Sequence, residues 1–158
     1  MNDKMIRRSG PTDQVAVEAI VRAAYSIYIE RIGKPPGPML DDYGGLIEAG
    51  AVHVLDDPDG TVAALIVLLP KVDHLLLDNI AVRPDRQGQG LGRRLISFAE
   101  TEALRLGFTE LQLYTHVTMT ENVALYTRLG FVETGRGRDA GYDRVFMTKR
   151  LNRDINFT

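Results

Sequence analysis

Apolar residues recur at helical spacing in the first part of the chain. They predict a helix that ends near Ile32, with Thr12 as its N-cap. The segment GKPPGPM then predicts irregular structure, because its prolines and glycines interrupt any periodic pattern. Asp41 or Asp42 is expected to open a short second helix that stops near Gly50. The apolar positions of the first helix are Val17, Ile20, Val21, Ala24 and Tyr28.

Seven strands are predicted, most of them as apolar runs. They lie at residues 4–9, 52–55, 62–69, 75–82, 111–116, 131–133 and 144–149. Two more helices are predicted at 91–106 and 122–129, and Gly107 and Gly130 stand where each would stop. The buried stripe of the longer helix is expected to be Leu91, Leu95, Ala99, Ala103 and Leu106.

This order of elements predicts an α/β fold of the α+β kind, with a mixed sheet that is mainly antiparallel in its N-terminal part. The helix at 91–106 should join strands 75–82 and 109–116 as a right-handed parallel unit. No repeat, low-complexity segment or linker interrupts the pattern, so residues 1–158 are expected to form one domain.

Composition excludes several classes of function. The net charge is −2, with 19 basic and 21 acidic residues, so we expect no nucleic-acid partner and no membrane surface. Cysteine is absent, which excludes disulfides, thiolate metal sites and a cysteine nucleophile. No metal is expected. The apolar runs are too short for a transmembrane helix, and no apolar run follows the charged N-terminus, so the expected location is cytoplasmic.

Three glycines fall within five positions in the segment DRQGQGLGRR, residues 85–94. A glycine-rich loop between a strand and a helix exposes the unpaired N–H groups of the first helical turn, which bind anions. The spacing is not that of a P-loop, which requires Lys and Ser/Thr where Arg93 and Arg94 stand. Nor is it the dinucleotide motif G-x-G-x-x-G. The alternative to a phosphate site is a tight connection with close helix–sheet packing.

The surrounding segment, NIAVRPDRQGQGLGRRLISFAE, resembles the acetyl-CoA-binding core of the GNAT superfamily of N-acetyltransferases. Gln87, Gly90 and Gly92 match the family pattern Q/R-x-x-G-x-G/A. A second segment, ALYTRLGFVETGR, is similar to the family's Tyr-x-x-Leu-Gly-Phe motif, which begins here at Tyr126. The resemblance covers most of the chain and is most specific over residues 77–134. It implies the GNAT fold, in which the two central parallel strands splay apart.

The resemblance also implies acetyl-CoA as the cofactor, with coenzyme A as product. The pyrophosphate would lie on the loop, with Arg86, Arg93 and Arg94 available as cations. The pantetheine arm would pair with the strand at residues 80–82. The candidate cofactor residues are Ile80, Ala81, Val82, Gln87, Gly88, Gln89, Gly90, Leu91, Gly92, Arg93, Asn122 and Tyr126.

Acetyl transfer requires a deprotonated amine and favours a proton donor for the leaving thiolate. Tyr126 matches the family tyrosine that gives this proton; otherwise it is a packed helix aromatic. The base is less defined, because Tyr114 stands where some family members have a glutamate. Asp78, inside the apolar strand LLLDNIAV, is the first candidate and His116 the second. Deprotonation through water, with no dedicated base, is a further alternative.

One asparagine of the family pattern is missing. Met119 stands seven residues before Tyr126, where many relatives have an asparagine that contacts pantetheine. Asn122, one helical turn before Tyr126, is the candidate replacement. Thr120 is expected to be the N-cap of this helix.

The segment YSIYIERIGKPPGPMLDDY corresponds to the variable region in which the family binds its acceptors. Its tyrosines and charges could position an amine, and Arg31 could bind an acidic acceptor. The alternative for each residue is helix core or solvated surface. The candidate substrate residues are Tyr28, Arg31, Asp42, Tyr43 and Tyr114, with Tyr25 nearby.

The sequence therefore predicts an acetyl-CoA-dependent N-acetyltransferase that acts on a primary amine of a small molecule. The alternatives are an acetyltransferase for protein amines and a domain that senses acyl-CoA without turnover. A nucleotide-binding fold of another kind does not match the motifs. A homodimer is possible, since dimers are common among proteins of the family.

Overall fold

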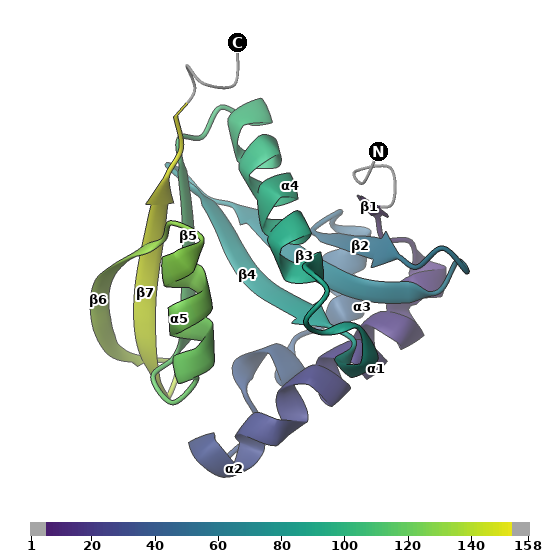
Figure 1. Ribbon diagram of the computed structural model, residues 1–158, viewed down its shortest axis with the longest axis horizontal. Coiled ribbons are helices and arrows are strands. Elements are labelled where there is room, and N and C mark those ends of the chain that lie inside the picture. Colours follow the sequence, from purple (N-terminus) through teal and green to yellow (C-terminus); the bar gives the residue numbers. More distant parts are fainter. Residues whose placement is uncertain (1–5, 153–158) are drawn as a thin grey trace. The chain divides into compact units, whose positions relative to one another are not determined.

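The computed structural model describes residues 6–152, and Figure 1 shows a mixed α/β fold. Its sheet has seven strands in the order β1-β2-β3-β4-β5-β7-β6. The strands are β1 (Ile6–Arg8), β2 (Val52–Asp56), β3 (Val62–Pro70), β4 (Leu75–Val82), β5 (Glu110–His116), β6 (Val132–Asp139) and β7 (Tyr142–Arg150). The α-helices are α1 (Gln14–Tyr25), α2 (Ile29–Ile32), α3 (Tyr43–Glu48), α4 (Leu91–Arg105) and α5 (Thr120–Arg128). Short 3-10 helices lie at Pro11–Asp13, Ser26–Tyr28, Gly37–Leu40 and Pro84–Arg86.

The chain forms two compact units. The first contains residues 6–68 and 79–98, and the second contains residues 69–78 and 99–152. Strand β4 and helix α4 each begin in one unit and end in the other.

The first unit contains an antiparallel sheet. Strand β1 pairs with β2, and β2 pairs with β3 with Val52 opposite Val67. Every residue of β3 from Val62 to Leu68 is buried, so both faces of this strand are covered. Helix α1 contributes a buried stripe to this core, as its apolar spacing predicted: Val17, Ile20 and Val21.

In the second unit, β4 pairs in parallel with β5, and Leu75 lies opposite Leu111. This confirms the predicted parallel pair. Strand β7 is antiparallel to both β5 and β6 and lies between them. One face of β5 and β7 is buried, while most of β6 is exposed. The buried residues on that face are Leu111, Leu113, Val145 and Met147.

The predicted helix at 12–32 is wrong as a single helix. A 3-10 turn at Ser26–Tyr28 separates α1 from α2, and it leaves Ile27 exposed while Tyr28 is buried. Thr12 is not the N-cap. The helical segment starts two residues earlier, at Gly10, whose N–H donates to Asp13 Oδ2 at 2.8 Å.

Smaller differences lie elsewhere. The irregular segment expected at GKPPGPM contains the 3-10 helix Gly37–Leu40. Leu106 is exposed because α4 ends at Arg105, and Gly107 turns the chain with a φ of +90°. Met119 rather than Thr120 caps α5, since its carbonyl accepts from the N–H groups of Asn122 and Val123. Strand β6 ends at Asp139, six residues beyond its predicted end at Glu133. The predicted first strand at 4–9 extends partly outside the described residues.

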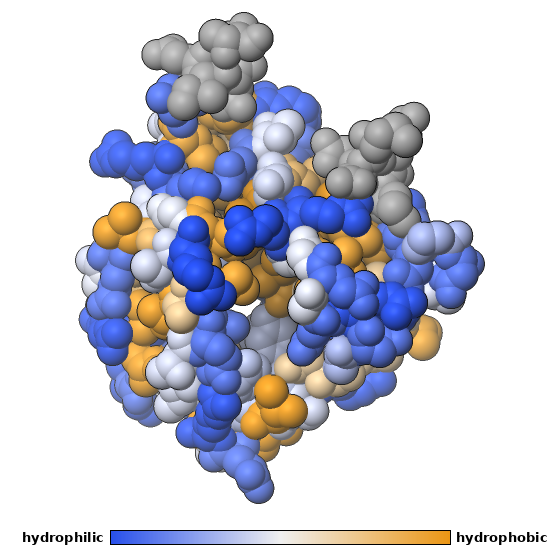
Figure 2. Space-filling view, in the orientation of Figure 1, coloured by the Kyte–Doolittle hydropathy of each residue, from blue (hydrophilic) through white to orange (hydrophobic). Residues whose placement is uncertain are grey.

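Hydrophilic side chains predominate on the face shown in Figure 2, and hydrophobic residues reach the surface in separate places among them. No helix within residues 6–152 is both long enough and apolar enough to cross a membrane.

Candidate functional site

The glycine-rich loop between β4 and α4 has a backbone that only glycine adopts without strain at two positions. Gly88 has a φ of +82° and Gly90 a φ of +80°. Gly92 instead lies in the first turn of α4 with an ordinary helical φ. A Cβ atom on any of the three would meet no other atom within 4 Å. The glycines are therefore not explained by close packing; they leave open space above the peptide groups.

Backbone donors accumulate in the same loop. In the described part of the chain, no acceptor binds the N–H groups of residues 88–93. The first N–H with a partner is that of Arg94, which donates to the Gly90 carbonyl at 3.1 Å. Six successive unpaired N–H groups at the start of a 15-residue helix form a site for an anion, and the helix dipole adds to it. A pyrophosphate fits this donor set.

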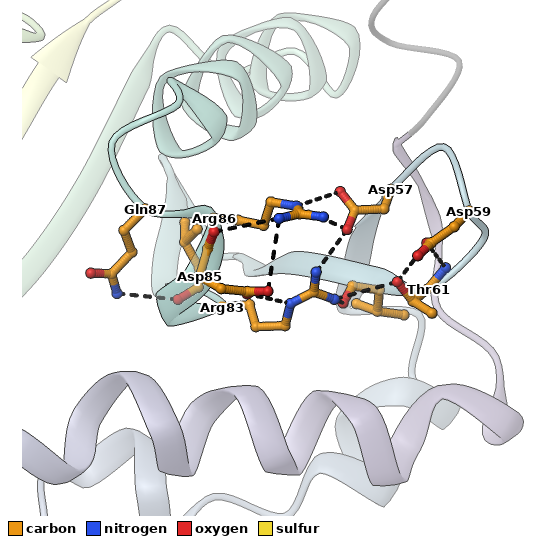
Figure 3. A network of polar contacts seen from close by, with 9 residues as sticks. Asp57, Asp59, Thr61, Arg83, Asp85, Arg86 and Gln87 are labelled. Carbon is orange, nitrogen blue, oxygen red and sulfur yellow. Dashed lines mark hydrogen bonds and ion pairs between the residues drawn. The ribbon is translucent and has the colours of Figure 1, made fainter.

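A cluster of charged residues holds the start of this loop in place (Figure 3). Asp57, at the end of the β2 segment, accepts from Arg83 Nη2 at 2.7 Å and from Arg86 Nε at 3.0 Å. Arg83 also donates to the Val62 carbonyl at 3.0 Å and to Asp85 at 2.6 Å. The hydrogen bond from Arg86, followed by that from Arg83, lowers the pKa of Asp57 below its usual range.

The loop cations differ in what they contact. Arg86 is engaged by Asp57, whereas Arg93 is exposed and makes no ion pair or side-chain hydrogen bond within residues 6–152. Gln87, the polar residue of the motif, donates from Nε2 to the Val82 carbonyl at 3.3 Å. Arg93 is therefore the loop arginine that remains available to a phosphate, and Arg86 serves the loop's own structure.

Asn79 is a residue that sequence reasoning missed. It is 3% exposed, and its Oδ1 accepts from the Tyr25 hydroxyl at 2.6 Å while its Nδ2 donates to the Tyr43 hydroxyl at 2.8 Å. The one hydroxyl proton of Tyr25 is shared with the Ile80 carbonyl, which lies 2.9 Å away, and the Tyr43 hydroxyl donates to the Pro38 carbonyl at 2.5 Å. One amide thus ties helices α1 and α3 to β4. The available signal was an asparagine within the apolar strand LLLDNIAV.

Asp78 and Tyr114 are brought together in the second unit. The Tyr114 hydroxyl donates to Asp78 Oδ1 at 2.9 Å, across the parallel pair of β4 and β5. Asp78 is half-buried, and the described residues supply no other donor to its carboxylate. The carboxylate expected to need a partner therefore has one, and it retains an oxygen that can bind a cation.

His116 has its Nδ1 atom occupied. The Thr118 backbone N–H donates to it at 3.2 Å, and the Thr118 hydroxyl lies 2.9 Å away. Since Nδ1 accepts from the peptide N–H, the neutral ring carries its proton on Nε2. This tautomer presents no lone pair to a substrate, which makes His116 a weaker candidate base than Asp78.

Tyr126 lies in α5 and is 5% exposed. Its ring packs edge-on against the Phe131 ring, and the two ring centres are 5.7 Å apart. Asn122, one turn earlier, donates from Nδ2 toward Thr115 Oγ1 at 3.5 Å, so this side chain faces β5. Both belong to the second unit, whereas the loop residues 87–92 belong to the first.

The candidate acceptor residues of the first unit have structural contacts of their own. Tyr28 is 8% exposed, and the Arg31 guanidinium lies 5.1 Å from the centre of its ring. Asp42 caps α3 by accepting from the Gly45 N–H at 3.2 Å. Tyr43 is 2% exposed. Arg31 and Asp42 are the exposed members of this set. No cluster of three His, Cys, Asp or Glu residues suited to a metal ion lies within the described residues.

A family model described as Acetyltransferase (GNAT) family matches residues 17–131. The chain therefore belongs to the GNAT family of acetyltransferases. This confirms the resemblance carried by the glycine loop and the Tyr126 segment.

Individual relatives match over shorter spans. The ribosomal protein bS18-alanine N-acetyltransferase of Escherichia coli (strain K12) is 39% identical over 75 residues, which cover 48% of this chain and 51% of that protein. The IAA acetyltransferase of Azospirillum brasilense is 38% identical over 72 residues, covering 44% and 47% of the two chains. The chain spans about half the length of the curated relatives it matches.

Solved structures match over nearly the whole chain. The crystal structure of the ribosomal-protein-S18-alanine N-acetyltransferase from Escherichia coli has a TM-score of 0.71 at 26% identity, covering 93% of each chain. The PaiA N-acetyltransferase from Thermoplasma acidophilum, solved in complex with coenzyme A, has a TM-score of 0.77 at 17% identity, covering 92% and 98%. The second likeness shows the fold alone. The predicted mixed α/β GNAT fold is confirmed by these neighbours.

Proposed function

We propose that this protein is an N-acetyltransferase that moves an acetyl group from acetyl-CoA to the primary amine of a small molecule. The observation that carries the proposal is the row of six unpaired N–H groups at residues 88–93, within a segment that the GNAT family model matches. When bound, acetyl-CoA supplies the thioester whose acetyl carbon passes to the amine nitrogen as the C–S bond breaks. The rest of the proposal concerns what this chain's own residues do.

Gly88, Gln89, Gly90, Leu91 and Gly92 would hold the pyrophosphate through their backbone N–H groups, and Arg93 would add a charge-assisted contact. Gln87, whose own N–H donates to the Pro84 carbonyl at 3.4 Å, would line the start of the same cofactor site. Ile80, Ala81 and Val82 would hold the pantetheine arm through their backbone, and Asn122 would contribute a side-chain amide. Support comes from the open space at each glycine and from the exposure of Arg93.

Tyr126 would give the proton of its hydroxyl oxygen to the leaving thiolate. Asp78 would bind the ammonium form of the acceptor, and the proton released from nitrogen would pass to its carboxylate or through water to solvent. Tyr114 would hold Asp78 in position through the hydrogen bond at 2.9 Å. Tyr28, Arg31, Asp42 and Tyr43 would shape the acceptor region, with Tyr43 acting through Asn79.

Acetyl transfer to a protein amine is the second candidate. It is favoured by one specific observation, the 39% identity over 75 residues to an enzyme named for the alanine of ribosomal protein bS18. The third candidate is an acyl-CoA sensor without turnover. We propose an enzyme instead, because Tyr126 matches the position of the family's acid. The proposed location of this enzyme is cytoplasmic. The proposal includes the association of two copies of the chain as a homodimer.

The test measures release of the coenzyme A thiol with acetyl-CoA and two acceptor panels, one of small amines and one of peptides with free N-termini. We expect turnover with small amines, and we expect acetyl-CoA but not NAD to raise the melting temperature, because a ligand of the native state stabilises it. Turnover with peptides alone would favour the second candidate. Binding of acetyl-CoA without turnover on either panel would leave the sensor, and no binding at all would refute the proposal.

A further inference from the structure

The face of the second unit's sheet that carries Asp78 and Tyr114 also carries a guanidinium. Arg144, on β7, pairs in register with His116, two residues along β5 from Tyr114. Its Cζ atom lies 4.0 Å from the centre of the Tyr114 ring and 5.7 Å from that of Tyr142. Two aromatic rings therefore fix the plane of this guanidinium, since arginine stacks on aromatic faces.

Most of the hydrogen-bonding capacity of Arg144 is unused. Its side chain is only 12% exposed, yet among residues 6–152 its one hydrogen-bond acceptor is Asp139, at 2.8 Å from Nη1. A guanidinium has five N–H donors, so four remain without a protein acceptor. No nitrogen of Arg144 is among the buried, unpartnered side-chain atoms of residues 6–152, so these donors reach the surface, where an anionic oxygen is the partner that satisfies a guanidinium best. Asp139 is 58% exposed, and an exposed ion pair contributes little, so it does not explain why the guanidinium is buried.

Opposite charges thus lie on the two sides of one tyrosine. The hydroxyl end of Tyr114 holds Asp78, whose second carboxylate oxygen accepts from no donor among residues 6–152, and the ring face of Tyr114 supports Arg144. A ligand that satisfies both would carry a cation for Asp78 and an anion for Arg144. Because one charged group lies at the end of the ring and the other above its centre, several bonds must separate the two charges of the ligand.

We infer that the acceptor is a small amine that also carries a carboxylate, of the ω-amino acid type, and that Arg144 is the residue that selects it. This inference rests on the proposed function and names its substrate class. The amine end would lie at Asp78, and the carboxylate would take the unpaired N–H donors of Arg144. An α-amino acid, in which one carbon separates the two groups, would satisfy only one end.

The test compares matched acceptors on the same protein: 5-aminopentanoate against 5-aminopentanamide, and glycine against glycinamide. For the wild type we expect kcat/KM to be at least about 10-fold higher for 5-aminopentanoate than for its amide, the factor that a charge-assisted hydrogen bond provides. The glycine pair should show a smaller ratio. Arg144→Gln should bring the acid-to-amide ratio close to one, because it lowers kcat/KM for the acid far more than for the amide, and Arg144→Lys should restore part of the ratio.

The matched control is Arg138→Gln. Arg138 is 67% exposed on the neighbouring strand β6 and pairs with Asp143, so it should leave the ratio unchanged. Melting temperatures identify any variant that fails to fold, and the effect of free 5-aminopentanoate on the melting temperature of wild type and Arg144→Lys gives a readout independent of turnover.

Two outcomes separate the failures. If the wild type acetylates amines but does not distinguish acid from amide, or if Arg144→Gln lowers both rates equally, Arg144 is structural and the inference is overturned while the proposed function stands. If no amine of any kind is acetylated and acetyl-CoA does not bind, the proposed function fails and this inference falls with it.

Discussion

Gly90→Ala, compared with Gly92→Ala, tests whether the loop backbone binds coenzyme A. Both changes add one methyl group, and the added Cβ would meet no atom within 4 Å at either position. They differ in backbone conformation, since Gly90 has a φ of +80° while Gly92 is helical. An L-residue in the left-handed region costs about 1–2 kcal/mol, whereas alanine in place of a helical glycine gains roughly 0.5–1 kcal/mol.

The two variants should therefore differ by about 1.5–3 kcal/mol in the free energy of unfolding. For a chain of this size, 1 kcal/mol corresponds to roughly 2–4 °C, so Gly92→Ala should melt about 3–12 °C above Gly90→Ala. The assay is thermal unfolding followed by circular dichroism, without ligand. Equal melting temperatures would refute the left-handed backbone at Gly90.

Ligand binding gives the second half of the same experiment. If Gly90→Ala relaxes the loop toward negative φ, the backbone N–H groups beside residue 90 change direction. Coenzyme A should then bind at least about 10-fold more weakly, the loss of one charge-assisted hydrogen bond, while Gly92→Ala should weaken binding less, because its backbone keeps the helical conformation. Calorimetric titration measures both constants. A stability difference without an affinity difference would mean that the glycines shape a turn and bind no phosphate.

Three further outcomes are expected. Tyr126→Phe should lower kcat about 10²- to 10⁴-fold with little change in the KM for acetyl-CoA; an unchanged kcat would remove the tyrosine from the chemistry. Asn79→Ala should cost about 1–3 kcal/mol in urea unfolding, and a double-mutant cycle with Tyr43→Phe should show coupling, whereas additive losses would contradict the amide bridge. The pKa of Asp57 is lowered in the folded protein. The ionised carboxylate therefore stabilises the fold above about pH 4, and this stabilisation is lost as the pH falls through the lowered pKa. Asp57→Asn should show a smaller acid-induced drop in melting temperature than the wild type.

Most strands were predictable because each has a clear period or composition, whereas β6, with the sequence VETGRGRD, has neither and was predicted too short. Strand β4 begins and ends at the predicted residues, since an apolar run is bounded there by a polar turn and by the glycine loop. The parallel pairing of β4 with β5 followed from the intervening helix. The loop conformation also followed from sequence, because three glycines in five positions before a helix have few other uses.

The helical region between Gln14 and Leu40 was harder, for a physical reason. The period of apolar residues cannot show that the chain tightens into a 3-10 turn at Ser26–Tyr28, because that turn depends on tertiary contacts. Tyr25 bonds to Asn79, which is more than 50 residues away in the chain.

Side-chain partners in the site were the least predictable feature. Asp78, Tyr114 and Tyr126 were identified by position, yet the hydrogen bond between Asp78 and Tyr114 depends on strand register. The hydrogen bonds from Arg83 and Arg86 to Asp57 join a turn to a loop 26 or more residues away. From the sequence, Arg86 was expected to be available to a phosphate. Arg144 gave no sequence signal, because its distinction is its burial on two aromatic rings.

The order of strands in the second unit affects how the protein is made. Strand β7 lies between β5 and β6, yet both of these strands are synthesised before it. A nascent chain that ends before Tyr142 has no partner for that edge of β5 and none for β6, and open strand edges promote aggregation. Chaperones that bind extended chains would therefore be needed longest for residues 110–139, and this half of the sheet can close only after Arg150 has been added.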